Sequence, residues 1–229
     1  MELVRVGNRS ASWQQVVEYV SEYLGAETAG APRSAYPAYD GYMLETATGP
    51  VIDADLLAPT LLNVRHLSVK TYYLLQQELT YWQPLLDQLD PALSLVDATA
   101  DDLRLVGALF AGIDEDRLDG AKATTLSKIL HRKRPALIPL QDKQVRRCYQ
   151  QGSEPRIPVV PGRGWADFTV ALAEEMQHDL RSQLDAFEQL SRLADGVPVT
   201  PLRALDIVAW FLGKPATAAE PTRSARRTR

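Results

Sequence analysis

Residues 118–147 read LDGAKATTLSKILHRKRPALIPLQDKQVRR, and this stretch decides the predicted fold. Gly120 precedes a short run with apolar residues at helical spacing, which predicts a tight turn followed by a helix. Pro139 then interrupts the chain, and Asp142 stands directly before a second short helical run. The order therefore predicts two short helices separated by Pro139, with an aspartate at the start of the second.

Helix-start signals flank this stretch on both sides. Four hydroxyl side chains stand directly before helical apolar repeats and predict N-caps: Ser12, Ser68, Thr99 and Thr200. Pro84 is expected to end the helix that Ser68 begins, and Gly112 the helix that follows Thr99. The longest helix is expected over residues 165–194, after a loop rich in glycine and proline at residues 152–164.

Seven or so helices with few strand signals predict an all-α fold. Glycine, proline and tyrosine are frequent in residues 36–53, so we expect a small irregular or hairpin insertion there. The helices are expected to form a single domain over residues 1–215, with the hairpin and aspartate core at residues 113–150. The arginine-rich residues 216–229 are predicted to be a disordered basic tail.

Composition excludes several classes of protein. The single cysteine, Cys148, cannot form an internal disulfide, which favours a reducing, cytoplasmic location. The three histidines and one cysteine show no spacing typical of a metal site, and no cofactor is expected. Neither a signal peptide nor a membrane span is predicted. The oligomeric state is left open.

Positive charge is concentrated in one segment. The chain carries a net charge of −4, yet residues 117–147 contain nine basic residues and two acidic ones. An acidic body with one basic segment favours a local anionic partner such as DNA. The alternative is a solvated helix face formed by Lys128, Arg132, Lys133 and Arg134.

The arrangement in residues 118–147 resembles that of the helix-hairpin-helix DNA glycosylases, most of all the adenine-mismatch branch. Aligned without a gap, Gly120 falls on the first hairpin glycine, and Asp142 on the catalytic aspartate. Lys122 stands where the second hairpin glycine is expected. Thr124 stands where lyase members carry a nucleophilic lysine, so the resemblance implies a monofunctional DNA N-glycosylase without Schiff-base chemistry.

A second resemblance spans most of the chain. Residues 128–139 share the block K-x-L-H-x-K-R-P-x-L-I-P with a family of uncharacterised actinobacterial proteins. That family implies no activity. The glycosylase resemblance covers about thirty residues within it. It implies the fold of the glycosylase core, with the hairpin contributed by residues 113–134.

The hairpin resemblance implies a nucleic-acid site. Backbone N–H groups at the start of the second helix can hold a phosphate, and an aspartate nearby can stabilise positive charge developing on a sugar. Asp142 is then the catalytic candidate. The candidate nucleic-acid-binding residues are Gly120, Lys122, Thr124, Lys128, Arg132, Lys133 and Arg146. We expect Asp142 to line a cleft with Lys122 or Arg146.

Three function classes follow: a nucleic-acid-binding protein on a glycosylase-like scaffold, an active base-excision glycosylase that uses Asp142, and an interaction protein without nucleic acid. Several candidates also have purely structural interpretations. Asp142 can serve only as a helix cap, and His131 as a hydrogen-bonded packing residue. Tyr36, Tyr39 and Tyr42, with Asp40 among them, can line a pocket or anchor a loop.

Overall fold

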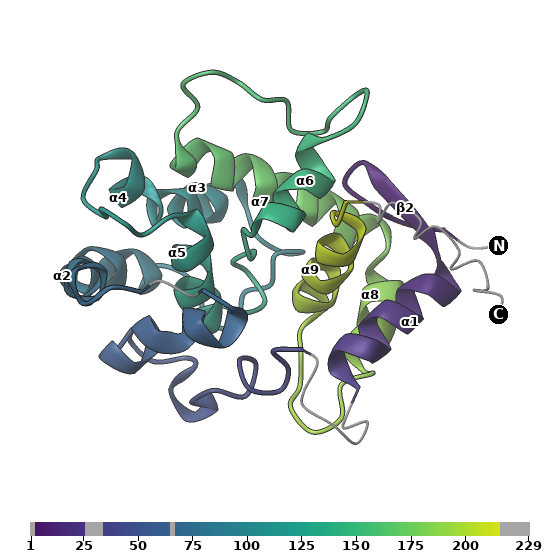
Figure 1. The fold of residues 1–229 in the computed structure, drawn as a ribbon, viewed down its shortest axis with the longest axis horizontal. Coiled ribbons are helices and arrows are strands. Elements are labelled where there is room, and N and C mark those ends of the chain that lie inside the picture. The colour runs from purple at the N-terminus through teal and green to yellow at the C-terminus, as the bar shows by residue number, and fades with distance from the viewer. Residues whose placement is uncertain (1–2, 26–33, 65–66, 216–229) are drawn as a thin grey trace, which may run out of the picture.

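The computed structural model describes residues 3–25, 34–64 and 67–215 (Figure 1). The α-helices of these residues are α1 (Trp13–Leu24), α2 (Val69–Leu86), α3 (Ala100–Ala108), α4 (Ala111–Asp114), α5 (Ala123–Leu130), α6 (Lys143–Gln150), α7 (Trp165–Ser182), α8 (Leu184–Ser191) and α9 (Pro201–Leu212). Three 3-10 helices join them: η1 (Leu44–Thr46), η2 (Asp53–Leu62) and η3 (His131–Lys133). The fold is mainly helical, as the sequence predicts.

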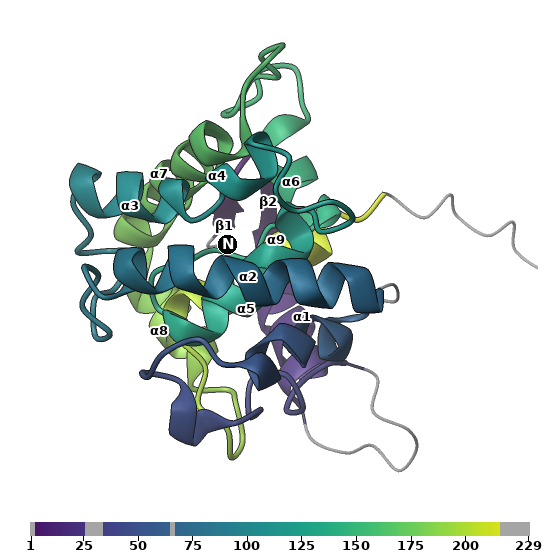
Figure 2. The same cartoon turned by 90° about the vertical axis from the view of Figure 1, so that its left-hand side faces the viewer.

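Two groups of helices lie on either side of α7. Figure 1 shows α2, α3, α4 and α5 on one side and α1, α8 and α9 on the other. Helix α7 contacts α3 and α4 in the first group and α8 and α9 in the second, so it connects the two. Figure 2, turned by 90°, shows α2 lengthwise on the outer face of the first group.

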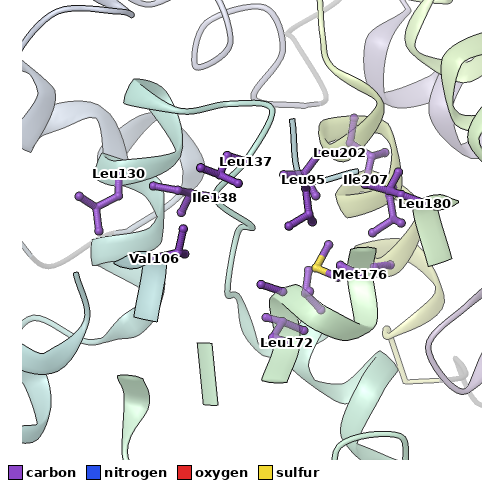
Figure 3. Close-up of a cluster of buried hydrophobic side chains, with 14 of the residues drawn as sticks. Leu95, Val106, Leu130, Leu137, Ile138, Leu172, Met176, Leu180, Leu202 and Ile207 are labelled. Atoms are coloured by element: carbon purple, nitrogen blue, oxygen red, sulfur yellow. The ribbon is translucent and has the colours of Figure 1, made fainter. Parts of the chain in front are cut away.

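One apolar core spans both groups. Leu130 and Ile138 from the hairpin region, Met176 from α7 and Ile207 from α9 belong to a single cluster of buried side chains (Figure 3). All four expose 1% or less of their surface. Burying apolar side chains stabilises the fold by roughly 1.5–3 kcal/mol each, so this cluster holds the hairpin region and α9 together.

The predicted N-caps are confirmed. Ser12 and Thr99 each accept a hydrogen bond from the backbone three residues later, and Gln15 and Asp102 complete the two capping boxes. Ser68 and Thr200 likewise cap α2 and α9. These caps are local interactions, which explains why the sequence alone identifies them.

Three predicted boundaries are wrong. Helix α2 continues past Pro84 to Leu86, because a proline near the helix end removes one hydrogen bond without stopping the last turn. Gly112 does not end a helix but lies within the short α4. The long helix over residues 165–194 is broken at Gln183, whose side chain both accepts from and donates to the backbone of Arg5.

The predicted hairpin within residues 36–53 is also wrong, whereas the irregular alternative is confirmed. In the part of the chain that the structure describes, those residues form turns and η1. The β-hairpin lies instead at the N-terminus, where β1 (Leu3–Val6) pairs with β2 (Arg9–Ser12) in antiparallel register. The predicted tail at residues 216–229 lies outside the described residues.

Candidate functional site

Asp142 is the N-cap of α6, and its side chain bonds to the backbone of the first helical turn. Its Oδ1 accepts hydrogen bonds from the N–H groups of Gln144, at 2.7 Å, and Val145, at 3.0 Å. The preceding residue, Gln141, is fully buried and tied to two other helices. Its carbonyl accepts from Thr124 Oγ1 and its side chain donates to Thr169 of α7. The carboxylate is therefore fixed relative to the start of α5.

Asp142 lines a cavity of about 170 Å³ between α1, α5, α6 and α9. The wall combines charged and aromatic side chains from segments far apart in the sequence. Its residues are Glu22, Tyr23, Ser34, Ala35, Leu62, Asn63, Lys128, Leu140, Asp142, Arg203, Asp206, Ile207, Trp210, Phe211 and Lys214. Helix α9 supplies the largest share of this wall, and it contacts both α1 and α6.

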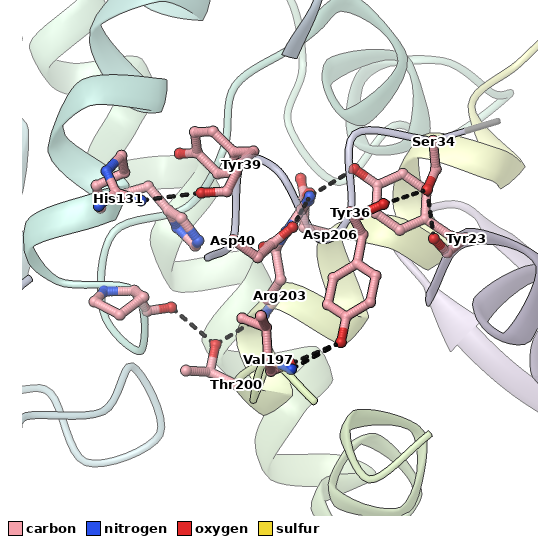
Figure 4. Close-up of polar contacts among 12 residues, drawn as sticks. Tyr23, Ser34, Tyr36, Tyr39, Asp40, His131, Val197, Thr200, Arg203 and Asp206 are labelled. Atoms are coloured by element: carbon pink, nitrogen blue, oxygen red, sulfur yellow. Dashed lines mark hydrogen bonds and ion pairs between the residues drawn. The ribbon is translucent and has the colours of Figure 1, made fainter. Parts of the chain in front are cut away.

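A buried ionic network forms one side of the cavity (Figure 4). Arg203 Nε lies 2.7 Å from Asp40 Oδ1, and Arg203 also pairs with Asp206 one turn along α9. The same guanidinium donates to the Tyr23 hydroxyl at 2.7 Å. One guanidinium thus contacts two carboxylates and a phenol in the protein interior, where an unpaired charge is costly.

Two titratable side chains that line the cavity have pKa values shifted by their surroundings. Burial raises the pKa of Asp206 to about 7; the charges of Asp142 and Asp40 add to the rise, and Arg203 opposes it. Burial also lowers the pKa of Lys128, while Asp142 and Asp206 oppose that effect. Asp206 is therefore a carboxyl group of the cavity lining whose protonation changes near neutral pH.

The cavity can hold one planar ring with polar edges. An engineered cavity of roughly 150 Å³ binds benzene, so the space here admits a ring of that size. Among the described residues, none donates a hydrogen bond to Oδ2 of Asp142. Trp210 offers an aromatic surface, while the carboxyl and ammonium groups offer acceptors and donors.

The solvated-face interpretation of the basic segment is wrong. Lys128, Arg132, Lys133 and Arg134 each expose 6% of their surface or less. Lys133 Nζ lies 2.6 Å from Asp55 Oδ2, and Lys128 Nζ donates to the carbonyl of Leu62. Arg132 donates to the carbonyl of Tyr39, and Arg134 donates to those of Leu86 and Leu89. Lys128 and Lys133 thus bind to η2, Arg132 to the loop at Tyr39 and Arg134 to the end of α2. Lys128 alone of the four lines the Asp142 cavity.

The other hairpin residues lie around the start of α5. Gly120 has φ +84°, and a Cβ there would lie 2.8 Å from Thr71 Oγ1, so glycine is required. Lys122 is exposed at the N-cap of α5. Arg146 donates to the Gln141 carbonyl and lies over the Trp165 ring, in a separate hollow. The residue beside Asp142 in its cavity is thus Lys128, in place of the expected Lys122 or Arg146.

The structural interpretations of His131 and the tyrosines agree with the geometry. Burial lowers the pKa of His131 to about 4, and its Nδ1 lies 2.7 Å from the Ile138 carbonyl oxygen. Tyr36 and Tyr39 are buried and bond to backbone carbonyls, which anchors their loop. Asp40 is the partner of Arg203.

Sequence reasoning missed the contribution of α9 to the site. The largely apolar run of residues 202–212 predicts a buried helix, and Arg203 and Asp206 interrupt that run. Two opposite charges one turn apart in an otherwise apolar helix are a usable signal, because buried charges are rare unless they are paired. Tyr23 and Trp210 gave no comparable signal.

Two further findings concern metal-binding groups and membrane-spanning helices in the described residues. Among the residues described, no three histidine, cysteine, aspartate or glutamate side chains gather as a metal-binding group. Within the same ranges, none of the helices has the length and apolar character required to cross a membrane.

The comparisons with known proteins identify a family but no activity. A model of a family of unknown function, DUF6308, matches residues 16–213, which include every element from α2 to α9. No curated protein matches the chain. No solved structure matches it either. Because the match covers most of the sequence, the chain belongs to the DUF6308 family of unknown function.

Proposed function

We propose that the protein binds DNA and takes one unpaired base into the Asp142 cavity. The observation that carries this proposal is the cavity itself: Asp142, Lys128 and Trp210 line a space of about 170 Å³ at the start of α6. Enzymes that act on a base extrude it and hold it by stacking and by hydrogen bonds to its edge. A carboxylate, an ammonium and an indole ring supply both kinds of contact.

The hairpin supports the same proposal. Gly120 adopts a left-handed conformation, and no side chain caps the following α5. A helix start without a side-chain cap presents N–H groups that suit a phosphate. Thr124 then connects this helix start to Gln141, directly before Asp142. In the glycosylases that the sequence resembles, a hairpin glycine, a helix start and an aspartate follow in the same order as Gly120, α5 and Asp142. This resemblance adds to the proposal but does not carry it.

The experiment compares a duplex that contains one bulged nucleotide with the same duplex fully paired. Fluorescence anisotropy at low salt gives the two dissociation constants. We expect binding to the bulged duplex to be at least about tenfold tighter, because extruding a paired base costs a few kcal/mol and 1.4 kcal/mol corresponds to tenfold. Folded protein that binds neither duplex would favour the interaction-protein alternative.

Monofunctional base excision is the second candidate function. The specific observation in its favour is that Asp142 uses Oδ1 for capping, while Oδ2 accepts no hydrogen bond from a described residue. An anionic oxygen of this kind can stabilise the positive charge that develops on the sugar as a base departs. Thr124 replaces the lysine of lyase members, so a Schiff base is not part of this candidate mechanism.

Substitutions of Asp142 separate capping from catalysis. Asp142→Asn keeps an acceptor for Gln144 and Val145, so its free energy of unfolding should stay close to that of the wild type. Asp142→Ala removes the cap and should lower that free energy by about 0.5–2 kcal/mol. If Asp142 is catalytic, both variants lose base release, measured as abasic sites on damaged and mismatched duplexes. An Asn variant as active as the wild type would exclude excision by Asp142.

A further inference from the structure

A second hollow adjoins the Asp142 cavity and differs from it in charge. It has a volume of about 690 Å³, and Phe211 and Lys214 line both spaces. Its other cations are Arg9 of β2 and Arg147 of α6. We call this hollow the basic groove and define its charge by Arg9, Arg147 and Lys214.

The basic groove concentrates positive charge that forms no salt bridge within the described residues. Its described lining residues include three cations and no carboxylate. None of the three forms a salt bridge with a described residue, whereas Arg104 and Arg192 elsewhere do. Three cations without a described salt-bridge partner line this groove, although the whole chain has a net charge of −4. Such a surface favours a polyanion.

The individual cations keep their charged ends available. Arg147 donates one hydrogen bond, to Gln144 Oε1 at 3.0 Å. The Lys214 ammonium lies 3.9 Å from the centre of the Trp210 ring and 4.1 Å from that of Phe211, in cation–π contact. Burial lowers the pKa of Lys214, and the charge of Glu22, which lines the Asp142 cavity, opposes that effect. A cation–π contact leaves the ammonium donors free for an anion.

The basic groove is lined by closely packed residues at Gly213 and at Phe211. At Gly213 a Cβ would lie 1.9 Å from the Gln144 carbonyl oxygen, so glycine allows the end of α9 to pack directly on the first turn of α6. The rings of Tyr19 and Phe211, which also line the groove, stack with centres 4.9 Å apart and planes 9° from parallel. The packing fixes the positions of Arg147 and Lys214 relative to the cavity.

We propose that the basic groove binds the phosphodiester backbone on one side of the nucleotide whose base enters the Asp142 cavity; this inference rests on the proposed function. The shared wall at Phe211 and Lys214 favours a nucleic-acid strand over other polyanions. A strand carries a planar ring on each sugar and a phosphate between successive sugars. It can therefore fill an aromatic cavity and an adjoining cationic groove at once.

The test measures how binding to the bulged duplex depends on salt. All proteins carry Arg223, Arg226, Arg227 and Arg229 replaced by glutamine, so that these four charges do not contribute. The groove variant is Arg9→Gln/Arg147→Gln, which keeps Lys214 because that residue also lines the Asp142 cavity. The control variant removes two exposed arginines elsewhere: Arg104→Gln/Arg192→Gln.

Each phosphate contact contributes about −0.9 to the slope of log K against log salt on duplex DNA. The groove variant should therefore flatten this slope by about 2, while the control variant keeps the parent slope. The preference for the bulged duplex should persist in the groove variant, because neither substituted residue lines the Asp142 cavity. Equal slopes in the groove variant and the parent, or equal flattening in groove and control variants, would overturn the groove and leave the proposed function standing. A parent protein that binds no DNA would overturn both.

Discussion

Replacing Arg203 with methionine is expected to lower the free energy of unfolding by about 3–5 kcal/mol. Arg203 is 3% exposed and is the shared partner of Asp40 and Asp206, whose side chains are 6% and 5% exposed. Methionine fills similar space but leaves both carboxylates in the interior without their cation. Removing one partner of a buried ion pair is costly because the remaining charge is not compensated.

The loss of stability in Arg203→Met should depend on pH, and the titration of Asp206 determines the direction of that dependence. Burial raises the pKa of this carboxyl to about 7, above its ordinary value of 3.8. A carboxyl with a raised pKa stabilises the folded state below that pKa and loses this contribution as the pH rises through it. Protonated Asp206 does not need a cation. The destabilisation by Arg203→Met should therefore be smaller at pH 6 than at pH 8.

Urea unfolding at the two pH values measures this loss, and Arg203→Lys is the control. Lysine keeps the charge but lacks the planar fork that contacts Asp40, Asp206 and Tyr23 together, so it should recover part of the stability. A loss below about 1 kcal/mol at pH 8 would contradict a buried network and resemble an exposed pair.

Replacing Lys133 with methionine is expected to lower the free energy of unfolding by a similar amount, about 3–5 kcal/mol. The side chains of Lys133 and Asp55 are both fully buried, and Nζ also donates to the Thr46 carbonyl at 2.9 Å. Arg132 Nε is the next cation, 3.6 Å from Asp55 Oδ1. A lysine on a solvated face would change stability by only about 0.5 kcal/mol.

The double variant Lys133→Met/Asp55→Asn supplies the matched control. Asparagine keeps an acceptor for the Ile52 N–H group, which bonds to Asp55 Oδ2 at 2.9 Å, but it carries no charge. The double variant should therefore be more stable than the sum of the two single losses predicts, as urea unfolding of all four proteins shows. Additive losses would mean that the two side chains do not form a pair in solution.

Local signals explain what the sequence could predict of this fold. The caps at Ser12, Thr99 and Asp142 each depend on a side chain and a backbone group two or three residues away. Gly120 could be identified in the same way, because a turn before a helix favours a left-handed residue. The position of Asp142 at a helix start therefore follows from neighbouring residues alone.

The rest depends on partners distant in the chain. Lys133 is buried because Asp55 lies against it from η2, and Lys128 reaches the Leu62 carbonyl. Gln183 interrupts the long helix because its amide bonds to Arg5, 178 residues away. Composition shows that a segment is basic, but only the fold determines whether its charges meet a partner inside the chain or outside it.

The same distinction applies to the candidate site. Asp142 could be found from the hairpin spacing, whereas Trp210, Asp206 and Lys214 reach the cavity only through the packing of α9 against α1 and α6. The positive charge that remains for an external anion lies at Arg9, Arg147 and Lys214, and Arg147 alone of these lies within the basic segment that the sequence emphasised.

The most direct test of the central claim is the ratio of the dissociation constants for the paired and bulged duplexes, measured for the wild type and for Trp210→Leu. Stacking of a base on an aromatic ring contributes about 1–3 kcal/mol, so the substitution should reduce the ratio by roughly tenfold. Trp165→Leu, in the separate hollow with Arg146, is the matched control and should leave the ratio unchanged. A wild type with equal affinity for both duplexes, or a Trp210→Leu variant that keeps the full preference, would contradict a base bound in the Asp142 cavity.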